Sequence, residues 1–516
     1  MFRIKIINIF LICSLFSPSQ FLISQEMVPP TLPTKVYYSV FVQSFYDSNA
    51  DGIGDIRGLI YKLDYLKELG VQGLWLLPVH PSPTYHKYDV SDYYGIHPDY
   101  GTLDDYKDLV TEAHKRGMTI LLDLVINHTS NRIKWFQEAS SNPSGKYRNW
   151  YLWSEKKADF SAEPFHWHAV RDSKGKQLAG PKYYGFFWWE MPDLNFDNPE
   201  VRSEMFNIAN FWLKDIGIDG FRIDAAKYIY PENQQEKTIQ WWKEFRQQAE
   251  KIKKDVVIVA EVWGPGKEIA PYLKDGMTAC FNFQLADSIR LSLQEETDHY
   301  ILQTWWQIRD LYKKQNNFYE DAIFLSNHDM NRIMTDIGNK TDKGKVAATL
   351  LLTLPGNPFI YYGEEIGMLG QKPDEYIREP FLWNVEGEDK GQTTWEKPFQ
   401  STSQTVKPLR YQLEDPKSLY VFYKKLINLR NSSMALSQGS FQPVIQMNPK
   451  VIAYYRALGD ESVLIMMNLS KEVQRLESPK GMEEYSMLLG THEVFKSGIG
   501  AIYLQPYSVF ILNKTK

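Results

Sequence analysis

Cysteine is scarce in this sequence, which has only Cys13 and Cys280. Cys13 falls in the N-terminal stretch MFRIKIINIFLICSLF, where Arg3 and Lys5 precede a short apolar run. Basic residues before such a run, with small and polar residues after it, are typical of a secretory signal peptide. We therefore predict that residues 1–24 are removed and that the mature protein is extracytoplasmic, either secreted or periplasmic. Only Cys280 would then remain, which excludes an intrachain disulfide, and its apolar neighbours predict an inert core residue.

An excess of basic residues and a second long hydrophobic run are also absent. The formal net charge is -5 at pH 7, so the chain has no basic footprint for nucleic acid. No segment after the N-terminal stretch is long and apolar enough to span a bilayer, and we expect no stable membrane insertion after processing. An uncleaved N-terminal membrane anchor is the alternative. The sequence leaves the oligomeric state open, and a monomer is favoured.

Short apolar runs alternate with amphipathic helical patterns through most of the chain. The runs lie at residues 36–42, 73–77, 119–125, 220–223, 256–260, 279–283, 322–326 and 358–362. Eight strands separated by helices favour a parallel α/β barrel over an open sheet. We therefore predict a (β/α)8 TIM barrel formed by residues 35–128 and 188–437.

Two segments break this rhythm. Residues 129–187 are rich in Trp, Tyr, Ser, Lys and Gly and lack a helical period. We interpret them as a small inserted domain after the third strand, over the mouth of the barrel. From about residue 438 the pattern changes to period-two runs such as SVLIMMNLS. Because such alternation predicts antiparallel strands, we expect a C-terminal β-sandwich domain over residues 438–516.

Three acidic residues lie just past three of the apolar runs. They are Asp224 in GFRIDAAK, Glu261 in VVIVAEVW and Asp329 in AIFLSNHDM. A barrel carries its catalytic groups at the carboxyl ends of its strands, and a buried carboxyl group costs free energy unless it is paired or used. Cleavage of a glycosidic bond with retention needs two carboxyl groups roughly 5–5.5 Å apart. The pattern therefore predicts an enzyme that cleaves glycosidic bonds, and aromatic residues, 14% of the chain, suit stacking on sugars.

Six ordered segments resemble the signature motifs of the α-amylase family of glycoside hydrolases. They are DLVINH (123–128), MPDLN (191–195), GFRIDAAK (220–227), EVW (261–263), SNHD (326–329) and GNPFIYYGEEIG (356–367). The resemblance covers essentially the whole mature chain. It implies that Asp224 is the nucleophile, that Glu261 is the general acid/base and that Asp329 holds the 2- and 3-hydroxyls of the bound sugar.

The same resemblance implies a set of substrate-binding residues. They are Tyr88, Asp89, His128, Arg222, Lys227 and His328. Arg222 would keep Asp224 ionised through its charge, and the two histidines would donate hydrogen bonds to the sugar. Plain packing is the alternative for Tyr88, a satisfied core position for the histidines, and simple surface charge for Lys227.

The loop DSNADGIGD (47–55) places oxygen ligands at alternating positions, as the first half of an EF-hand loop does. The ligands would be Asp47, Asn49, Asp51 and Asp55, but the glutamate that ends an EF-hand loop is missing. Several members of the family that the chain resembles bind Ca²⁺ (or Mg²⁺) in such a loop, with a further ligand that corresponds to the carbonyl of Ile53. We expect Ca²⁺ here in a stabilising role. A loop of Asx turns without a metal is the alternative.

The sequence favours an extracytoplasmic, endo-acting α-amylase that hydrolyses α-1,4 bonds of starch-like glucans or malto-oligosaccharides. Tyr228 and Asn195 depart from the motifs of many α-amylases, and the PDLN form looks more like that of oligo-1,6-glucosidases. An exo-acting α-glucosidase, an oligo-1,6-glucosidase or a transglucosidase is therefore the alternative. A non-catalytic glucan-binding relative is a remote one, since all three acidic residues are present.

Overall fold

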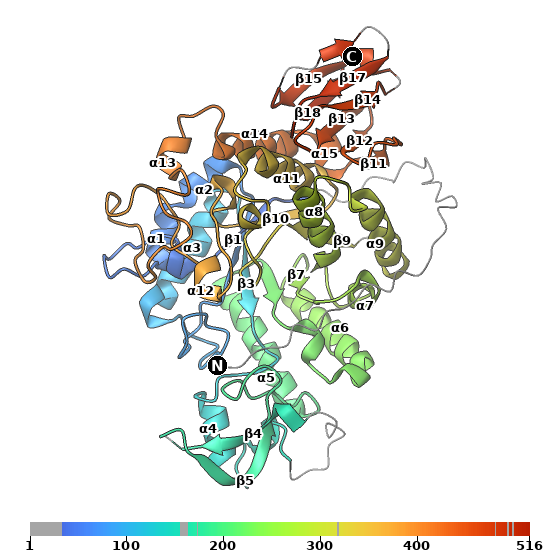
Figure 1. Cartoon of the computed structure of the whole chain (residues 1–516). Helices are drawn as coiled ribbons and strands as arrows, with labels where there is room; N and C mark the ends of the chain where they lie inside the picture. Colours follow the sequence, from blue (N-terminus) through green and yellow to red (C-terminus); the bar gives the residue numbers. More distant parts are fainter. Residues whose placement is uncertain are drawn as a thin grey trace.

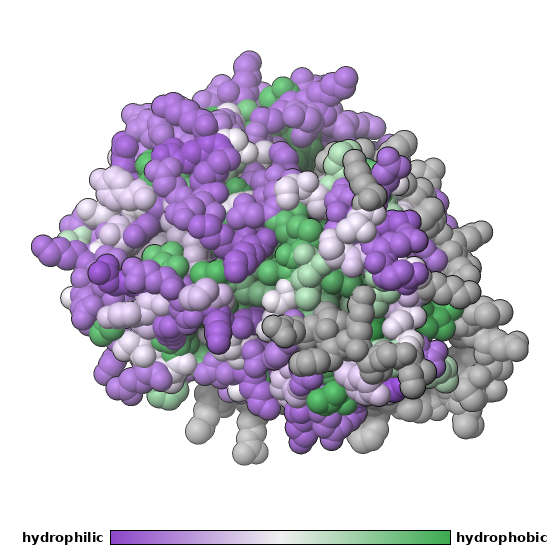
Figure 2. Space-filling model, turned by 90° about the horizontal axis from the view of Figure 1, so that it is seen from above, coloured by the Kyte–Doolittle hydropathy of each residue, from purple (hydrophilic) through white to green (hydrophobic). Residues whose placement is uncertain are grey.

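The computed structural model describes residues 34–154, 164–172, 174–316, 319–479, 481–492, 495–497 and 500–515. The predicted signal peptide, residues 1–24, lies outside this part of the chain. Across the described residues no helix combines the length and the apolarity needed to cross a bilayer. The face seen from above in Figure 2 is mostly hydrophilic, with small hydrophobic patches between the polar residues.

Eight parallel strands close into a barrel, as predicted. They are β1 (Tyr37–Val40), β2 (Gly73–Leu76), β3 (Thr119–Leu124), β6 (Gly220–Ile223), β7 (Val257–Ala260), β8 (Ala279–Phe281), β9 (Glu320–Phe324) and β10 (Asn357–Tyr361). Their order around the barrel is β1-β10-β9-β8-β7-β6-β3-β2. The run 279–283 is strand only as far as Phe281, because the Asn282 side chain accepts a hydrogen bond from the N–H of Leu285 and caps the next helix.

Helices cover the outside of the barrel (Figure 1). The longer ones are α2 (Leu63–Leu69), α3 (Leu103–Lys115), α5 (Pro199–Asn210), α6 (Gln235–Ile252), α8 (Phe283–Glu295), α9 (Ile301–Gln315), α11 (Thr341–Thr353) and α14 (Leu419–Ser432), and shorter ones include α1 (Ile56–Tyr61) and α7 (Gly266–Ile269). Their apolar faces pack on the strands, and α3 begins with a capping box between Thr102 and Asp105. Aromatic rings fill the barrel interior, where Phe281 lies 5.3 Å from Trp75 and 5.0 Å from Phe359 between ring centroids.

The segment between β3 and β6 forms a small antiparallel hairpin at the carboxyl end of the barrel, seen at the bottom of Figure 1. Its strands are β4 (Trp167–Arg171) and β5 (Gln177–Tyr184). Although its sequence shows no helical period, the segment also contains the helix α4 (Lys134–Ser141). Two turns are too short for a visible period, yet Phe136 and Ala139, three residues apart, are both buried on one face of α4.

The C-terminal region consists of two antiparallel sheets, as predicted. One has the order β11-β12-β13-β18-β15 and the other β14-β17-β16. Their strands are β11 (Ser440–Pro443), β12 (Val451–Leu458), β13 (Glu461–Asn468), β14 (Gln474–Glu477), β15 (Tyr485–Gly490), β16 (Phe495–Ser497), β17 (Ala501–Leu504) and β18 (Val509–Lys514), after the short helix α15 (Met434–Gln438). Leu476 and Ile502 of the smaller sheet share a buried cluster with Leu464 and Phe510 of the larger one.

Two buried arginines lie at the junction of this region with the barrel. Arg456 on β12 donates to the carbonyls of Thr353, at the end of α11, and of Gly439. Arg430 on α14 donates to the carbonyls of Leu352 and Gly356. Main-chain oxygens at the end of α11 therefore hold side chains from both sides of the junction.

Candidate active site

A buried arginine at the end of β6 holds three carboxyl groups. Nη1 of Arg222 lies 2.8 Å from Oδ1 of Asp123 and 2.9 Å from Oδ1 of Asp224. Nη2 of the same side chain is hydrogen-bonded to Oε2 of Glu261. Since β3, β6 and β7 are neighbours in register, three distant segments converge here. One guanidinium therefore bridges Asp224 and Glu261 and brings the two carboxyl groups to the same part of the barrel end.

Glu261 is set up to hold a proton near neutral pH. Burial raises the pKa of Glu261 to about 8, with the opposing charge of Arg222 and the negative charge of Asp224 as further influences. A protonated carboxyl group beside an ionisable one supplies an acid and a nucleophile to the same bond. The arrangement can therefore protonate a glycosidic oxygen and attack the anomeric carbon of that linkage.

This pKa predicts the basic limb of the pH profile. If Glu261 acts as the general acid, kcat/KM requires its protonated form and falls as pH rises through the raised pKa. We expect the fall to be centred near pH 8. Initial rates measured across the pH range on one glucan substrate test this, and a fall centred on the ordinary glutamic acid pKa of about 4.3 would contradict it.

Asp329 follows β9 and is held by two basic side chains. Nη2 of Arg378 lies 3.0 Å from its Oδ1, and Nε2 of His328 lies 3.1 Å from its Oδ2. Burial alone would raise the pKa of Asp329, but these two partners outweigh it and hold that pKa well below its usual range. Asp329 is therefore an anion at the wall of the cavity that Asp224 and Glu261 line.

Tyr88 links the two halves of the site. Its ring stacks on that of His328 with 5.4 Å between centroids, and its hydroxyl lies 2.6 Å from Nε2 of His328 and 3.1 Å from Oδ2 of Asp123. Its carbonyl oxygen lies 3.0 Å from Nε2 of His128. Asp89 beside it is buried, accepts hydrogen bonds from Ser82 and Thr84, and leaves Oδ2 without a protein partner.

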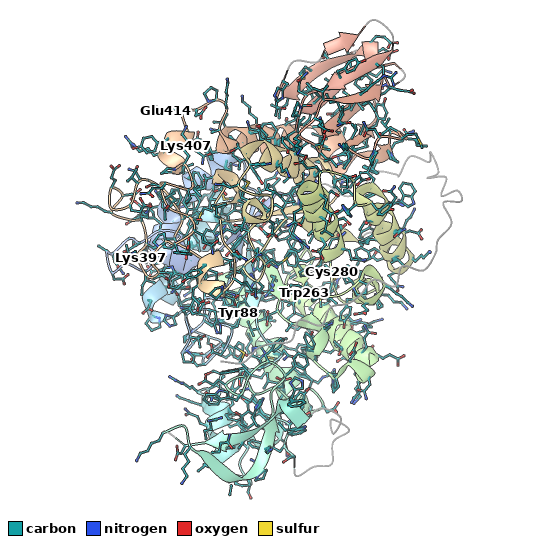
Figure 3. The ribbon with its side chains drawn as sticks, viewed as in Figure 1. Tyr88, Trp263, Cys280, Lys397, Lys407 and Glu414 are labelled. Carbon is teal, nitrogen blue, oxygen red and sulfur yellow. The ribbon has the colours of Figure 1, made fainter. Side chains whose placement is uncertain are left out.

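These side chains surround a cavity of about 580 Å³ at the carboxyl end of the barrel. Of the predicted site residues, its walls include Tyr88, Asp89, His128, Asp224, Glu261 and Asp329. Tyr88 and Trp263 mark its place in Figure 3, at the barrel end nearest the inserted segment. Arg222 and His328 lie behind the lining residues that they contact. Lys227 lies elsewhere, on a neighbouring cavity, where its Nζ donates to the carbonyl of Trp263 over 2.8 Å.

Sequence reasoning missed several lining residues. Arg378 forms an ion pair with Asp329, and its Nη2 also lies 3.4 Å from Oδ2 of Asp374, four residues earlier in the chain. Phe187 and Trp263 add aromatic rings that are about half exposed, at 45% and 47%. The spacing of Asp374 and Arg378 was the only available signal for Arg378, and it matches any helical ion pair.

The predicted metal loop lies away from this cavity. Its side-chain oxygens accept hydrogen bonds from backbone N–H groups of the same loop. The N–H of Gly52 donates to Asp47 over 2.7 Å, that of Asp51 to Asn49 over 2.9 Å, and that of Ile53 to Asp51 over 2.8 Å. Asp55 caps α1 through the N–H of Gly58. Within the described ranges no three His, Cys, Asp or Glu side chains gather as they would around a metal ion. The donors suit a hard cation in kind, but here they form successive Asx turns.

Comparison with known proteins agrees with this geometry. The family model "Alpha amylase, catalytic domain" matches residues 39–439, and the model of the "Alpha-amylase SusG C-terminal domain" matches residues 451–511. The chain belongs to the α-amylase family. It is therefore a glycoside hydrolase built on the barrel that this family shares.

Individual members of the α-amylase family resemble the chain over nearly its whole length. Alpha-amylase 3 of Dictyoglomus thermophilum is 43% identical over 484 residues, which cover 94% of each chain. The solved α-amylase from H. orenii matches with a TM-score of 0.84 and 38% identity, covering 93% of this chain and 99% of that one. The oligo-1,6-glucosidase of Bacillus cereus is 31% identical, over 93% of this chain and 98% of its own. Relatives with different specificities thus share this framework.

Proposed function

We propose that the protein is a retaining, endo-acting α-amylase that hydrolyses α-1,4 bonds of starch-like glucans. One observation carries the proposal: Asp224 and Glu261 share the Arg222 guanidinium and line one cavity. In this mechanism Asp224 attacks the anomeric carbon while Glu261 protonates the leaving oxygen. Water activated by Glu261 then hydrolyses the covalent glycosyl-enzyme.

The other site residues would bind and orient the sugar. Asp329 would hold the 2- and 3-hydroxyls, and its charge would stabilise the oxocarbenium-like transition state. Tyr88 would stack on the bound glucose, and Asp89 would contact it from the cavity wall. Arg222 and His328 would act through the carboxyl groups that they hold, rather than by touching the sugar.

The endo-acting assignment is supported by the 43% identity to a named α-amylase. The second candidate is an exo-acting glucosidase or transglucosidase, and the similarity to an oligo-1,6-glucosidase favours it. Both use the same two carboxyl groups, so products distinguish them. We would incubate the purified enzyme with maltoheptaoside capped at its non-reducing end, with maltose and with isomaltose. Cleavage of the capped chain is expected, and activity confined to the two disaccharides would instead establish the second candidate.

We also propose that the loop 47–55 binds Ca²⁺, supported by its donor set of Asp47, Asn49, Asp51, Asp55 and the carbonyl of Ile53. Selective binding to the folded state would stabilise it by about 2.7 kcal/mol at a hundred times the Kd. A chelator should therefore lower the melting temperature, and added Ca²⁺ should restore it.

A pair of variants makes this test specific to the loop. Asp51→Asn should weaken the response to Ca²⁺ while keeping its turn to Ile53. Asp92→Asn changes an equivalent exposed turn, to Tyr94, and should respond as the wild type does. A melting temperature that changes neither with the chelator nor with added Ca²⁺ would favour the metal-free loop.

The extracytoplasmic location is likewise a proposal, supported by the N-terminal sequence. N-terminal sequencing of the protein recovered from the periplasm or medium should begin near Gln25. Recovery of the intact N-terminus in the membrane fraction would favour an anchor.

A further inference from the structure

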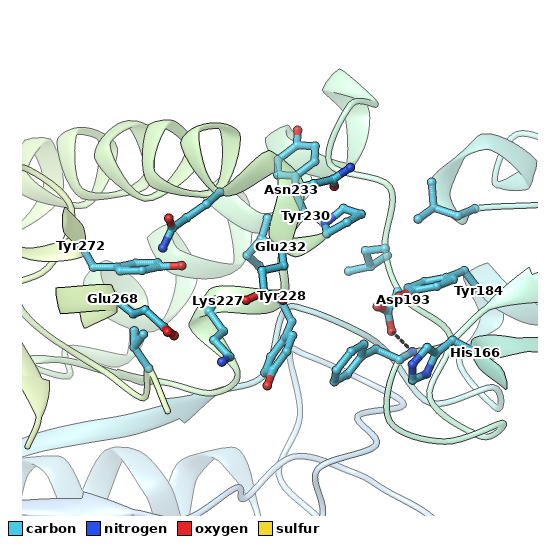
Figure 4. Close-up of a pocket in the computed structure, with 17 residues that line it drawn as sticks. His166, Tyr184, Asp193, Lys227, Tyr228, Tyr230, Glu232, Asn233, Glu268 and Tyr272 are labelled. Carbon is cyan, nitrogen blue, oxygen red and sulfur yellow. Dashed lines mark hydrogen bonds between the residues drawn. The ribbon is translucent and has the colours of Figure 1, made fainter. Parts of the chain in front are cut away.

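One wall of the catalytic cavity is formed by a single loop, residues 369–379. Lys372, Asp374 and Arg378 belong to this loop, and all three line the cavity. None of them lines the neighbouring cavity shown in Figure 4, whereas Tyr228 lines both. The position of the loop therefore sets the shape of the catalytic cavity at this wall.

A buried carboxylate at the end of this loop holds a separate turn, residues 399–401. Glu379 is 0% exposed, and its Oε1 accepts hydrogen bonds from the N–H of Phe399 over 2.7 Å and that of Gln400 over 2.8 Å. Its Oε2 accepts one from the N–H of Ser401 over 2.7 Å. Hydrogen bonds to a charged acceptor are roughly twice as strong as those between neutral groups. Three consecutive backbone donors are therefore fixed to one side chain of the loop.

The same turn contacts the loop at two further points. Oγ of Ser401 donates to the carbonyl of Leu369 over 2.7 Å and accepts from the N–H of that residue over 2.9 Å. The ring of Phe399 packs on that of Tyr376, with 5.3 Å between centroids. The turn is therefore connected to the start, the middle and the end of the loop.

The end of the loop also carries a partner of the catalytic aspartates. Arg378 directly precedes Glu379, and its Nη2 lies 3.0 Å from Oδ1 of Asp329 while its Nε donates to the carbonyl of His328. Neighbouring side chains thus reach in different directions, one to the cavity wall and the other to the turn. A group in a site is placed accurately only when the residues behind it are themselves fixed. Displacement of the loop end would shift Arg378 relative to Asp329 while leaving both groups present.

The main chain of the loop has separate attachments to the barrel. The hydroxyl of Tyr362 donates to the carbonyl of Glu379 over 2.8 Å, and Nε of Arg332 donates to that of Ile377 over 3.0 Å. These bonds do not involve the Glu379 carboxylate. A change confined to this carboxylate should therefore leave the loop folded and reduce the accuracy of its position.

We propose that Glu379 is a positioning residue for the reaction, because it fixes the loop 369–379 against the turn 399–401 and so sets the positions of Asp374 and Arg378 in the cavity wall. The proposal rests on the proposed use of this cavity for the sugar. Glu379 itself would not touch the substrate.

Glu379→Gln tests this directly, because glutamine keeps the size of the side chain but replaces one oxygen with an NH2 group. In either orientation at least one of the three backbone N–H groups then faces another donor. KM should rise at least about fivefold, the factor that corresponds to one net hydrogen bond. It would be measured on whichever of capped maltoheptaoside, maltose and isomaltose the wild type cleaves. A lower kcat at an unchanged KM, which a smaller folded fraction would cause, would overturn the proposal.

Two further variants complete the comparison. Glu386 is exposed and accepts a hydrogen bond from the N–H of Ser403 over 2.7 Å, so Glu386→Gln is the matched control and should keep the wild-type KM. Ser401→Ala removes both hydrogen bonds to Leu369 while Glu379 is intact. It should also raise KM, which keeps the test decisive if Glu379→Gln does not fold, and an unchanged KM would contradict the proposal.

A binding measurement separates this proposal from the assignment of the reaction. Maltoheptaose would be titrated calorimetrically into Asp224→Asn, with and without Glu379→Gln. Weaker binding, by a similar factor, supports the role of Glu379 whatever products the wild type makes. Equal affinities would overturn it even if the wild type cleaves starch.

Discussion

Asp224→Asn is expected to lower kcat by at least about 10⁴-fold, the size of effect seen when a member of a catalytic set is removed. Asparagine has nearly the shape of aspartate and can still accept from Arg222, but its amide cannot attack the anomeric carbon. Because Arg222 keeps Asp123 and Glu261 as partners in this variant, the far-ultraviolet spectrum and melting temperature should stay close to those of the wild type. Steady-state rates on soluble starch provide the measurement.

A matched aspartate provides the control. Asp255 is exposed before β7, at the opposite end of the barrel, and Asp255→Asn should retain wild-type activity. More than a few per cent residual activity in Asp224→Asn would show that the nucleophile lies elsewhere.

Arg222→Met should both inactivate and destabilise the enzyme. Its side chain is 1% exposed and is the shared partner of Asp123, Asp224 and Glu261. Removing one partner of a buried ion pair costs about 3–5 kcal/mol, because the remaining charge is left uncompensated. Urea unfolding followed by tryptophan fluorescence gives the free energy of unfolding for comparison with the wild type.

The decrease in the free energy of unfolding that Arg222→Met causes should depend on pH in a defined direction. Without the guanidinium, the pKa values of Asp123 and Glu261, which burial already raises to about 7 and about 8, rise further above their unfolded values. The folded state then binds more protons, so its stability falls as pH increases through those values. The free energy of unfolding of Arg222→Met should therefore fall further below that of the wild type at pH 8 than at pH 5.

An exposed arginine supplies the comparison for this variant. Arg57 also contacts two carboxylates, Asp105 and Asp108, but its side chain is 45% exposed. Arg57→Met should change the free energy of unfolding by no more than about 1 kcal/mol at either pH. A deficit for Arg222→Met as small as this, or one independent of pH, would refute the uncompensated-charge explanation.

The sequence predicted the features that leave a periodic or ordered trace. Eight apolar runs predicted the barrel, because parallel strands buried on both faces must be apolar throughout. Asp224, Glu261 and Asp329 were found because each follows such a run. Their mutual distances could not be predicted, since these depend on how β6, β7 and β9 close around the barrel.

Features created by tertiary contact left no comparable signal. Arg378 reaches Asp329 across 49 residues of sequence, and nothing local to either residue indicates the pair. The neighbouring cavity of Figure 4 exists only where the inserted segment faces Tyr228 and Tyr272. The loop at 47–55 does carry a local signal, since its alternating oxygens predict metal ligands, and the same atoms accept hydrogen bonds from backbone N–H groups.

Arg456 couples the C-terminal sheets to the barrel, and Arg430 on the barrel side holds main-chain oxygens of the same junction. Arg430 and Arg456 donate to main-chain oxygens from α11 and the turn after it. Separation of β12 from the barrel would expose the guanidinium of Arg456 and the carbonyl of Thr353 at the end of α11 together, and water would have to solvate both. Partial separation at this junction therefore costs free energy, and the C-terminal sheets stabilise the end of α11 in the barrel rather than moving independently of it.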